Sequence, residues 1–179
     1  PATEDHPLRP ISSYGVVKSA IEQYLGMYRQ LGVLQPVILR PSNPYGPRQS
    51  AAGAQGVVAA FLARAGEGQG VTIWGDGSTV RDYLYVDDLV ALAVRAGESG
   101  EVGVFNAGSG EGVSLDQLCA RIRAVTGAAL PVDYLPARGI DVRQVVLDID
   151  RARRVFGWQA RTTLDEGLSR TWQTMRRAT

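Results

Sequence analysis

Cysteine and histidine are almost missing from this sequence of 179 residues, which has one of each. A single cysteine excludes an internal disulfide, and so few ligands argue against a zinc site or a histidine-based catalytic site. Cys119 falls on the apolar face of a predicted helix, so we expect it to pack in the core. The chemistry must therefore come from tyrosine, lysine, acidic residues, arginine or a bound cofactor.

Long apolar runs and runs of basic residues are also missing. Arg, Asp or Gly interrupts every apolar stretch well before the roughly 18 residues that a membrane span needs, and the sequence shows no amino-terminal signal pattern. The net charge is +1, with 19 basic and 18 acidic residues. We therefore expect a cytoplasmic protein that binds neither membranes nor nucleic acids. Lysine is nearly absent, and although arginine suits phosphate recognition, high-GC coding bias produces the same composition.

Hydrophobic residues make up 45% of the chain and charged residues 21%, which is typical of a globular domain. Ser12 or Ser13 can cap a first helix, Asp87 a later one, and Ser114 and Thr163 open two more with capping boxes. The predicted helices span about 13–31, 55–65 and 87–96 and follow Ser114 and Thr163; the predicted strands span 33–40, 71–74, 83–86 and 102–106, and 41–53 is a predicted loop. This alternation predicts an α/β fold with a parallel sheet.

Tyr14 and Lys18 stand four residues apart in the first predicted helix. At this spacing both side chains project from one helix face, about one turn apart. A tyrosine with the ordinary pKa of about 10 is a poor base at neutral pH. A neighbouring ammonium favours the phenolate form of a tyrosine. The pair therefore fits general acid–base catalysis, although many solvated helix faces carry the same spacing.

A loop rich in proline and glycine, residues 40–48, follows the second predicted element. In open α/β sheets, ligands bind beyond the carboxyl ends of the strands, and this loop leaves such an end. Asn43 offers both a hydrogen-bond donor and an acceptor there. The alternative is a purely structural loop in which Asn43 bonds to nearby backbone.

Residues 74–88 contain a second loop with polar residues. Gly75 and Gly77 permit a tight turn, after which Arg81 could grip a phosphate in a forked geometry. Trp74 could stack on a base or could equally be a core aromatic. Asp87 is better explained as a helix cap than as an acid catalyst.

Together these segments resemble the extended short-chain dehydrogenase/reductase family, in particular its nucleotide-sugar epimerases and dehydratases. Further matches, in family order over essentially the whole chain, are Asn106–Gly110, Ser114, Arg138–Val142, Asp148, Ala152, Gly157–Trp158 and Leu164–Leu168. The resemblance implies an α/β fold, the carboxyl-terminal part of a Rossmann-type parallel sheet plus a small mixed α/β substrate-binding region. Residues 1–50 would complete the Rossmann-type domain and 51–179 would form mostly the substrate region, with about 83–107 returning to the former.

The resemblance also implies roles for single residues. The tyrosine that matches Tyr14 is the acid and base for the sugar hydroxyl, and the lysine that matches Lys18 holds the nicotinamide ribose and favours the phenolate. Both are thus expected to contact the cofactor, NAD, with Pro41 and Ser42 against its nicotinamide. The resemblance further implies a homodimer that packs through the Tyr14 helix.

The implied substrate is a nucleotide-diphosphate sugar. Asn43 matches a residue at its phosphate–sugar portion, and Gln55 falls where the family often has asparagine. Trp74 matches an aromatic near the uracil ring, and Arg81 and Arg138 match the pair that grips the diphosphate. The expected reaction is epimerisation of a UDP-sugar at C4 through a 4-keto intermediate, with NAD holding the hydride between steps.

Three alternatives stay open. The first is a 4,6-dehydratase, against which Gly15 after the tyrosine is a mild family-level hint. The second is a non-catalytic nucleotide-sugar-binding or dimerisation module. In the third the chain does not fold alone, because a parallel sheet without its first strands exposes a long apolar edge.

The glycine-rich dinucleotide motif of the family has no convincing match. Gly97, Gly100 and Gly103 have its spacing but follow a predicted helix and precede a strand, which is the reverse of the required order. Gly53, Gly56 and Ala59 open a predicted helix but follow a proline-rich loop rather than a strand. We expect this motif, and the family's Ser or Thr at the sugar hydroxyl, upstream of Pro1, and we expect the 179 residues alone to be inactive.

Overall fold

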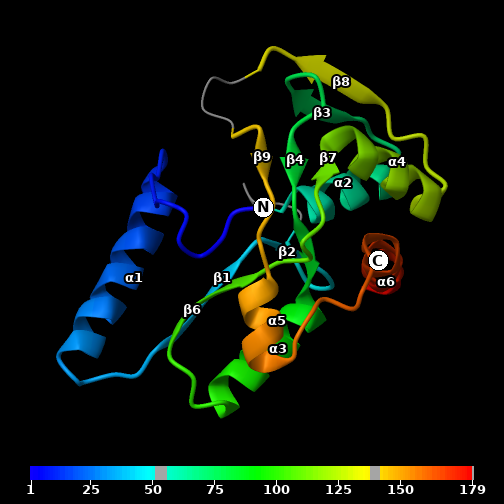
Figure 1. Ribbon diagram of the computed structural model, residues 1–179. Helices are drawn as coiled ribbons and strands as arrows, with labels where there is room; N and C mark the ends of the chain where they lie inside the picture. The colour runs from blue at the N-terminus through cyan, green and yellow to red at the C-terminus, as the bar shows by residue number, and fades with distance from the viewer. Residues whose placement is uncertain (51–55, 138–141, 179) are drawn as a thin grey trace.

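Helices and short strands alternate along the residues that the computed structural model describes, 1–50, 56–137 and 142–178. The helices are α1 Ser13–Gln30, α2 Val57–Gly66, α3 Val86–Glu98, α4 Leu115–Thr126, α5 Asp150–Phe156 and α6 Leu164–Ala178. The strands are β1 Val37–Pro41, β2 Asn43–Tyr45, β3 Val71–Trp74, β4 Val80–Arg81, β5 Tyr83–Tyr85, β6 Gly103–Ala107, β7 Val113–Ser114, β8 Val132–Leu135 and β9 Gln144–Val145 (Figure 1).

Parallel pairing dominates the strands, as predicted. β1 pairs with β6 from Val37↔Gly103 to Pro41↔Ala107, and β2–β5, β3–β8 and β4–β9 are also parallel. Only the short contact between β4 and β7 is antiparallel among the described residues. The strands form several small sheets, and the one around β4 is of mixed direction.

Two hydrophobic cores lie on either side of β5, whose side chains alternate between them. Tyr83 and Tyr85 belong to the first core, and Leu84 belongs to the second. The first core lies among α2, α4, α6 and β3, which gather on one side of the molecule, and the second packs α3 and α5 against β1 and β6 (Figure 1). Cys119 lies in the first core, 1% exposed, which confirms its predicted packing, and burial raises the pKa of its thiol.

Several element boundaries differ from the prediction. β1 begins at Val37 rather than at 33, after Pro36, and residues 43–45 of the predicted loop form β2 because β5 supplies them with a pairing partner. Asp87 is not the cap of α3, because the capping position is Tyr85. Asp87 lies in the first turn, where its carboxylate interacts favourably with the helix dipole and stabilises the helix. The pattern missed β4, β7, β8, β9 and α5, which are short elements.

The predicted caps of α1 and α4 are present, whereas only one of the two hydrogen bonds of the predicted α6 box is found among the described residues. Ser12 Oγ accepts a hydrogen bond from Gly15 N–H at the start of α1. At α4, Ser114 Oγ accepts from Gln117 N–H at 3.1 Å, and Gln117 Oε1 accepts from Ser114 N–H at 2.9 Å, which is the predicted capping box. Glu166 N–H donates to Thr163 Oγ1 before α6.

Replacement of the α4 cap tests how far this box stabilises the protein. We expect Ser114→Ala to lower the free energy of unfolding by about 1 kcal/mol, because Gln117 N–H loses its acceptor. Urea unfolding would measure the change. Ser114→Asp is the control, since aspartate also caps helices, and equal losses in the two variants would contradict the prediction.

Helix α1 differs from the other helices because it has no buried residue. It stands apart from the rest of the chain (Figure 1), and it exposes large apolar side chains such as Val17 (56%), Ile21 (49%) and Tyr28 (40%). β1, the strand nearest to it in sequence, pairs with β6 and with no other strand in the described part of the chain. An apolar surface of this kind is typical of an interface. No helix among the described residues is long and apolar enough to span a membrane.

Candidate functional site

Tyr14 and Lys18 lie next to each other on α1. The Lys18 ammonium nitrogen is 5.4 Å from the centroid of the Tyr14 ring, and the Tyr14 side chain is 57% exposed. The helix sets this distance by itself, since residues four apart lie one above the other. The pair can therefore present a phenol and a cation to a bound molecule.

Other tyrosines near the site are poor candidates for an acid–base role. Tyr45 lies in β2 with Asn43, and Tyr83 begins β5 shortly after Arg81 ends β4. Both tyrosines are buried, 3% and 5% exposed. Burial raises the pKa of Tyr83 to about 12 and raises that of Tyr45 further. Both phenols stay protonated at neutral pH, which leaves Tyr14 as the exposed phenol beside a cation.

Ser42 and Asn43 occupy the junction between β1 and β2. Ser42 N–H donates to the Ala107 carbonyl at 2.9 Å, which continues the β1–β6 pairing. Both the N–H and the side-chain amide of Asn43 donate to the Asp82 carbonyl, at 3.0 and 2.9 Å. The side-chain amide of Asn43 thus has the structural role that the sequence left open, and its predicted contact with substrate stays a prediction.

Asp82 is fully buried and joins the parts of this region. Its Oδ1 accepts hydrogen bonds from Ser42 Oγ and from the N–H and hydroxyl of Ser109. Its Oδ2 accepts from the N–H groups of Gly110 and Leu147. Sequence reasoning assigned no role to this residue, although a carboxylate directly before the predicted strand 83–86 was a visible signal.

Gly108 is required for the approach of Asp82. A Cβ at position 108 would lie 2.4 Å from Asp82 Oδ2. The absence of a side chain therefore lets the 108–110 backbone close around the carboxylate. Asp82 in this way holds Ser42 and the loop after β6 in one arrangement.

Arg81 and Trp74 lie at the ends of β4 and β3. Arg81 Nη1 donates to the carbonyls of Val80 and Val142, each at 2.8 Å. Trp74 is 41% exposed while its neighbour Ile73 is buried, so the core alternative for Trp74 is wrong. Gln55 and Arg138, the other predicted substrate contacts, lie outside the described residues.

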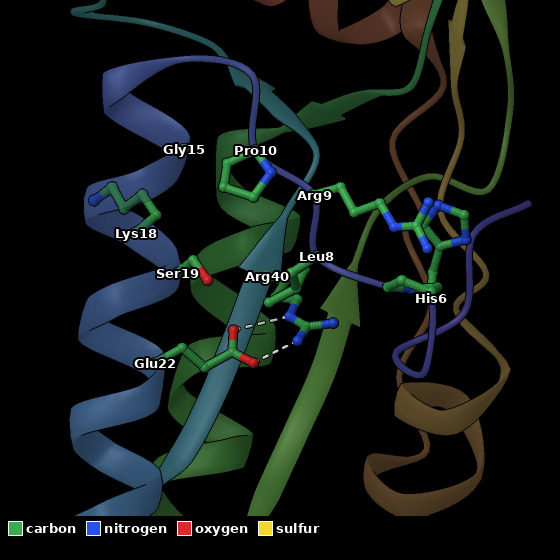
Figure 2. A pocket seen from close by; sticks show the side chains of 10 residues that line it. His6, Leu8, Arg9, Pro10, Gly15, Lys18, Ser19, Glu22 and Arg40 are labelled. Atoms are coloured by element: carbon green, nitrogen blue, oxygen red, sulfur yellow. Dashed lines mark hydrogen bonds and ion pairs between the residues drawn. The ribbon is translucent and has the colours of Figure 1, made fainter.

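Two adjoining hollows connect these residues. One, of about 600 Å³, lies between residues 6–10 and α1 and is lined by Lys18 (Figure 2). The other, of about 350 Å³, lies at the end of β1. Its lining includes Pro41, Ser42, Asn43 and Arg81. His6, Leu8 and Arg40 line both. The fold thus brings most of the described site predictions to one region, whereas Tyr14 lies beside it and Trp74 lines neither hollow.

The first residues of the chain form part of this region, which sequence reasoning did not foresee. Ala2 N–H donates to the Val146 carbonyl at 2.8 Å, and Asp148 N–H donates to the Ala2 carbonyl at 2.9 Å. Glu4 Oε1 accepts from Asn106 N–H at 2.9 Å. These bonds place residues 6–10 opposite α1 (Figure 2).

The described residues fit one end of a dinucleotide. Lys18 offers ammonium donors for ribose hydroxyls beside a hollow of about 600 Å³, which is large enough for part of a cofactor. Among the described glycines, the three with the spacing of the dinucleotide motif provide no cradle for the pyrophosphate. Gly97 lies in α3, and Gly100 and Gly103 lead into β6, so the order is helix then strand, as expected.

Comparison with known proteins agrees with this picture. Residues 1–108 match the NAD dependent epimerase/dehydratase family. The UDP-glucose 4-epimerase of Mycolicibacterium smegmatis is 43% identical over 172 residues, which cover 96% of this chain and 55% of that protein. The chain therefore spans about half the length of the curated relatives it matches.

Solved structures agree as well. The UDP-glucose 4-epimerase of Thermotoga maritima with UDP-glucose superposes with a TM-score of 0.95 at 40% identity, covering 99% of this chain and 58% of that one. The Thermus thermophilus UDP-glucose 4-epimerase in complex with NAD gives 0.93 at 36% identity, covering 99% and 58%. The α/β fold and the family resemblance inferred from the motifs are confirmed. This chain belongs to the NAD dependent epimerase/dehydratase family.

Proposed function

We propose that the complete gene product containing this chain binds NAD and epimerises a nucleotide-diphosphate sugar, a UDP-sugar, at C4 through a 4-keto intermediate. The observation that carries the proposal is the Tyr14–Lys18 pair beside a hollow that adjoins Ser42, Asn43 and Arg81. The relatives named as UDP-glucose 4-epimerases support the choice of substrate and cofactor.

Tyr14 and Lys18 are the proposed catalytic residues. The Tyr14 phenolate takes the proton of the sugar 4-hydroxyl and later returns it. The Lys18 ammonium, 5.4 Å from the centroid of the Tyr14 ring, would donate to the nicotinamide ribose. Pro41 and Ser42 would hold the nicotinamide. NAD, when bound, supplies the hydride acceptor.

The substrate lies across the second hollow in this proposal. Arg81 donates from Nη1 to two backbone carbonyls. Its Nε–H and Nη2–H₂ groups make no hydrogen bond to the described residues. They suit the diphosphate, together with Arg138. Asn43 and Gln55 contact the phosphate–sugar portion. Trp74, exposed at the end of β3, stacks on the base.

The organisation of the protein is part of the proposal. Residues 1–50 and about 83–107 belong to the Rossmann-type domain, and the remainder of 51–179 forms the substrate region. Two copies associate through α1, whose exposed apolar side chains include Val16 (52%), Ile21 (49%) and Met27 (41%). The 179 residues by themselves are inactive in this proposal, because Gly97, Gly100 and Gly103 have the spacing of the dinucleotide motif but lead from a helix into a strand.

Incubation of the complete gene product with UDP-glucose or UDP-N-acetylglucosamine tests the function. Proton NMR is expected to show the C4 epimer without net consumption of NAD. A 4-keto-6-deoxy product would identify a 4,6-dehydratase instead. A protein that retains no NAD and converts neither sugar would be a binding or dimerisation module.

A further inference from the structure

Arg40 on β1 makes a two-point ion pair with Glu22 on α1. Arg40 Nε donates to Glu22 Oε2 at 2.9 Å, and Arg40 Nη2 donates to Glu22 Oε1 (Figure 2). Each side chain is 21% exposed. The planar fork of arginine matches the two carboxylate oxygens, so the contact constrains direction as well as distance.

The pair joins the two rows of residues that build the proposed site. Tyr14, Lys18 and Glu22 follow one another at intervals of four on α1, so they form one stripe along the helix. Arg40 lies in β1, which ends at Pro41, and Ser42 follows directly after the strand. Both residues line the second hollow. The ion pair therefore links the stripe with the phenol and the ammonium to the strand that leads into Ser42.

Little else holds α1 in place. No residue of α1 is buried. In residues 1–50, 56–137 and 142–178, we find no other hydrogen bond or ion pair between α1 and another helix or strand. Arg40 Nη1 also donates to the Glu4 carbonyl at 2.8 Å, which adds the anchored first residues to the same junction.

We propose that Glu22 and Arg40 are positioning residues that set the orientation of α1 relative to β1, and with it the distance of Tyr14 and Lys18 from Ser42. The inference rests on the proposed function. Neither side chain touches the reacting atoms in this role. Loss of the pair should slow the proton and hydride steps while the diphosphate end of the site, around Arg81, stays as it is.

Glu22→Gln in the complete gene product is the central test. Its amide keeps the size of the side chain but loses the charge and one acceptor. We expect kcat to fall about 100-fold, the usual cost of a misplacement of about 1 Å, while KM for the UDP-sugar changes less than about threefold. Arg40→Lys, which keeps the charge but not the fork, should lie between wild type and Glu22→Gln.

Asp165→Asn is the matched control. It breaks the Arg121–Asp165 pair, whose oxygen–nitrogen distance is 2.8 Å and which lies far from α1 between α4 and α6. We expect its kcat to equal that of wild type. A Glu22→Gln protein with wild-type kcat would overturn the proposal, as would a loss of kcat that only follows a loss of folded protein by circular dichroism.

Hydrogen exchange separates this inference from the proposed function. The α1 amides should exchange faster in Glu22→Gln than in wild type, with α4 unchanged. If the wild-type protein converts no sugar, the proposed function fails, and exchange alone decides whether the pair anchors α1. Unchanged exchange in α1 would then reject the anchoring role as well.

Discussion

Tyr14→Phe is expected to lower kcat for UDP-sugar epimerisation by about 10³-fold, within the range for removal of a general acid–base group. The phenylalanine keeps the ring beside Lys18 but removes the oxygen that is proposed to exchange a proton with the sugar hydroxyl. KM should change little, because the proposed contacts to the diphosphate lie at Arg81 and not on α1. Coupled-enzyme kinetics on the complete gene product would measure both quantities.

Tyr24→Phe is the control for this prediction. Tyr24 lies on the same helix and is 63% exposed, but it carries no cation beside its ring in the described structure. We expect its kcat to equal that of wild type. Equal activity of Tyr14→Phe and wild type would remove Tyr14 from the mechanism and leave the function of the pair structural.

Asp82→Ala is expected to lower the free energy of unfolding by about 3–5 kcal/mol. The substitution removes a buried acceptor from Ser42, Ser109, Gly110 and Leu147, and the donors keep the cost of burial without a partner. Urea unfolding would measure the loss.

Asp133→Ala provides the matched control for Asp82. Asp133 lies exposed on β8, so its removal should change the free energy of unfolding by less than about 0.5 kcal/mol. A loss for Asp82→Ala as small as that of Asp133→Ala would mean that water replaces the carboxylate, and Asp82 would then not hold the site together.

Local patterns predicted every described helix except α5, because most helix signals lie within a few residues of one another. Ser114 and Gln117 predicted the start of α4. Gly127 ends this helix with a φ of 72°, in the left-handed conformation expected of a terminal glycine. The short strands were harder. The strand propensity of residues 43–45 alone does not identify β2, because these residues become a strand through their pairing with β5.

Alternation along β3 places Trp74 on the face opposite to Ile73, but it does not say which face is buried. Val71 and Ile73 are buried and Trp74 is exposed, as the period of two along β3 requires. The sequence left two roles open for Trp74 because it does not show which face of so short a strand meets the core. The packing of α2 and α4 over the first core decided it.

By itself the sequence determined the α/β class, through the alternation of helix and strand patterns along the chain. It also determined the helix caps at Ser12 and Ser114 and the adjacency of Tyr14 and Lys18, since these depend on residues within one or two helical turns. Only the tertiary structure decided which distant groups meet: Leu147 N–H reaches Asp82 across 65 positions, and Glu22 meets Arg40 across 18. Such contacts carry no periodic signal, because a single hydrogen bond or ion pair depends on how whole helices and strands pack. The adjacency of Tyr14 and Lys18 is thus a property of one helix, and the alignment of this pair with the rest of the proposed site is a property of the fold.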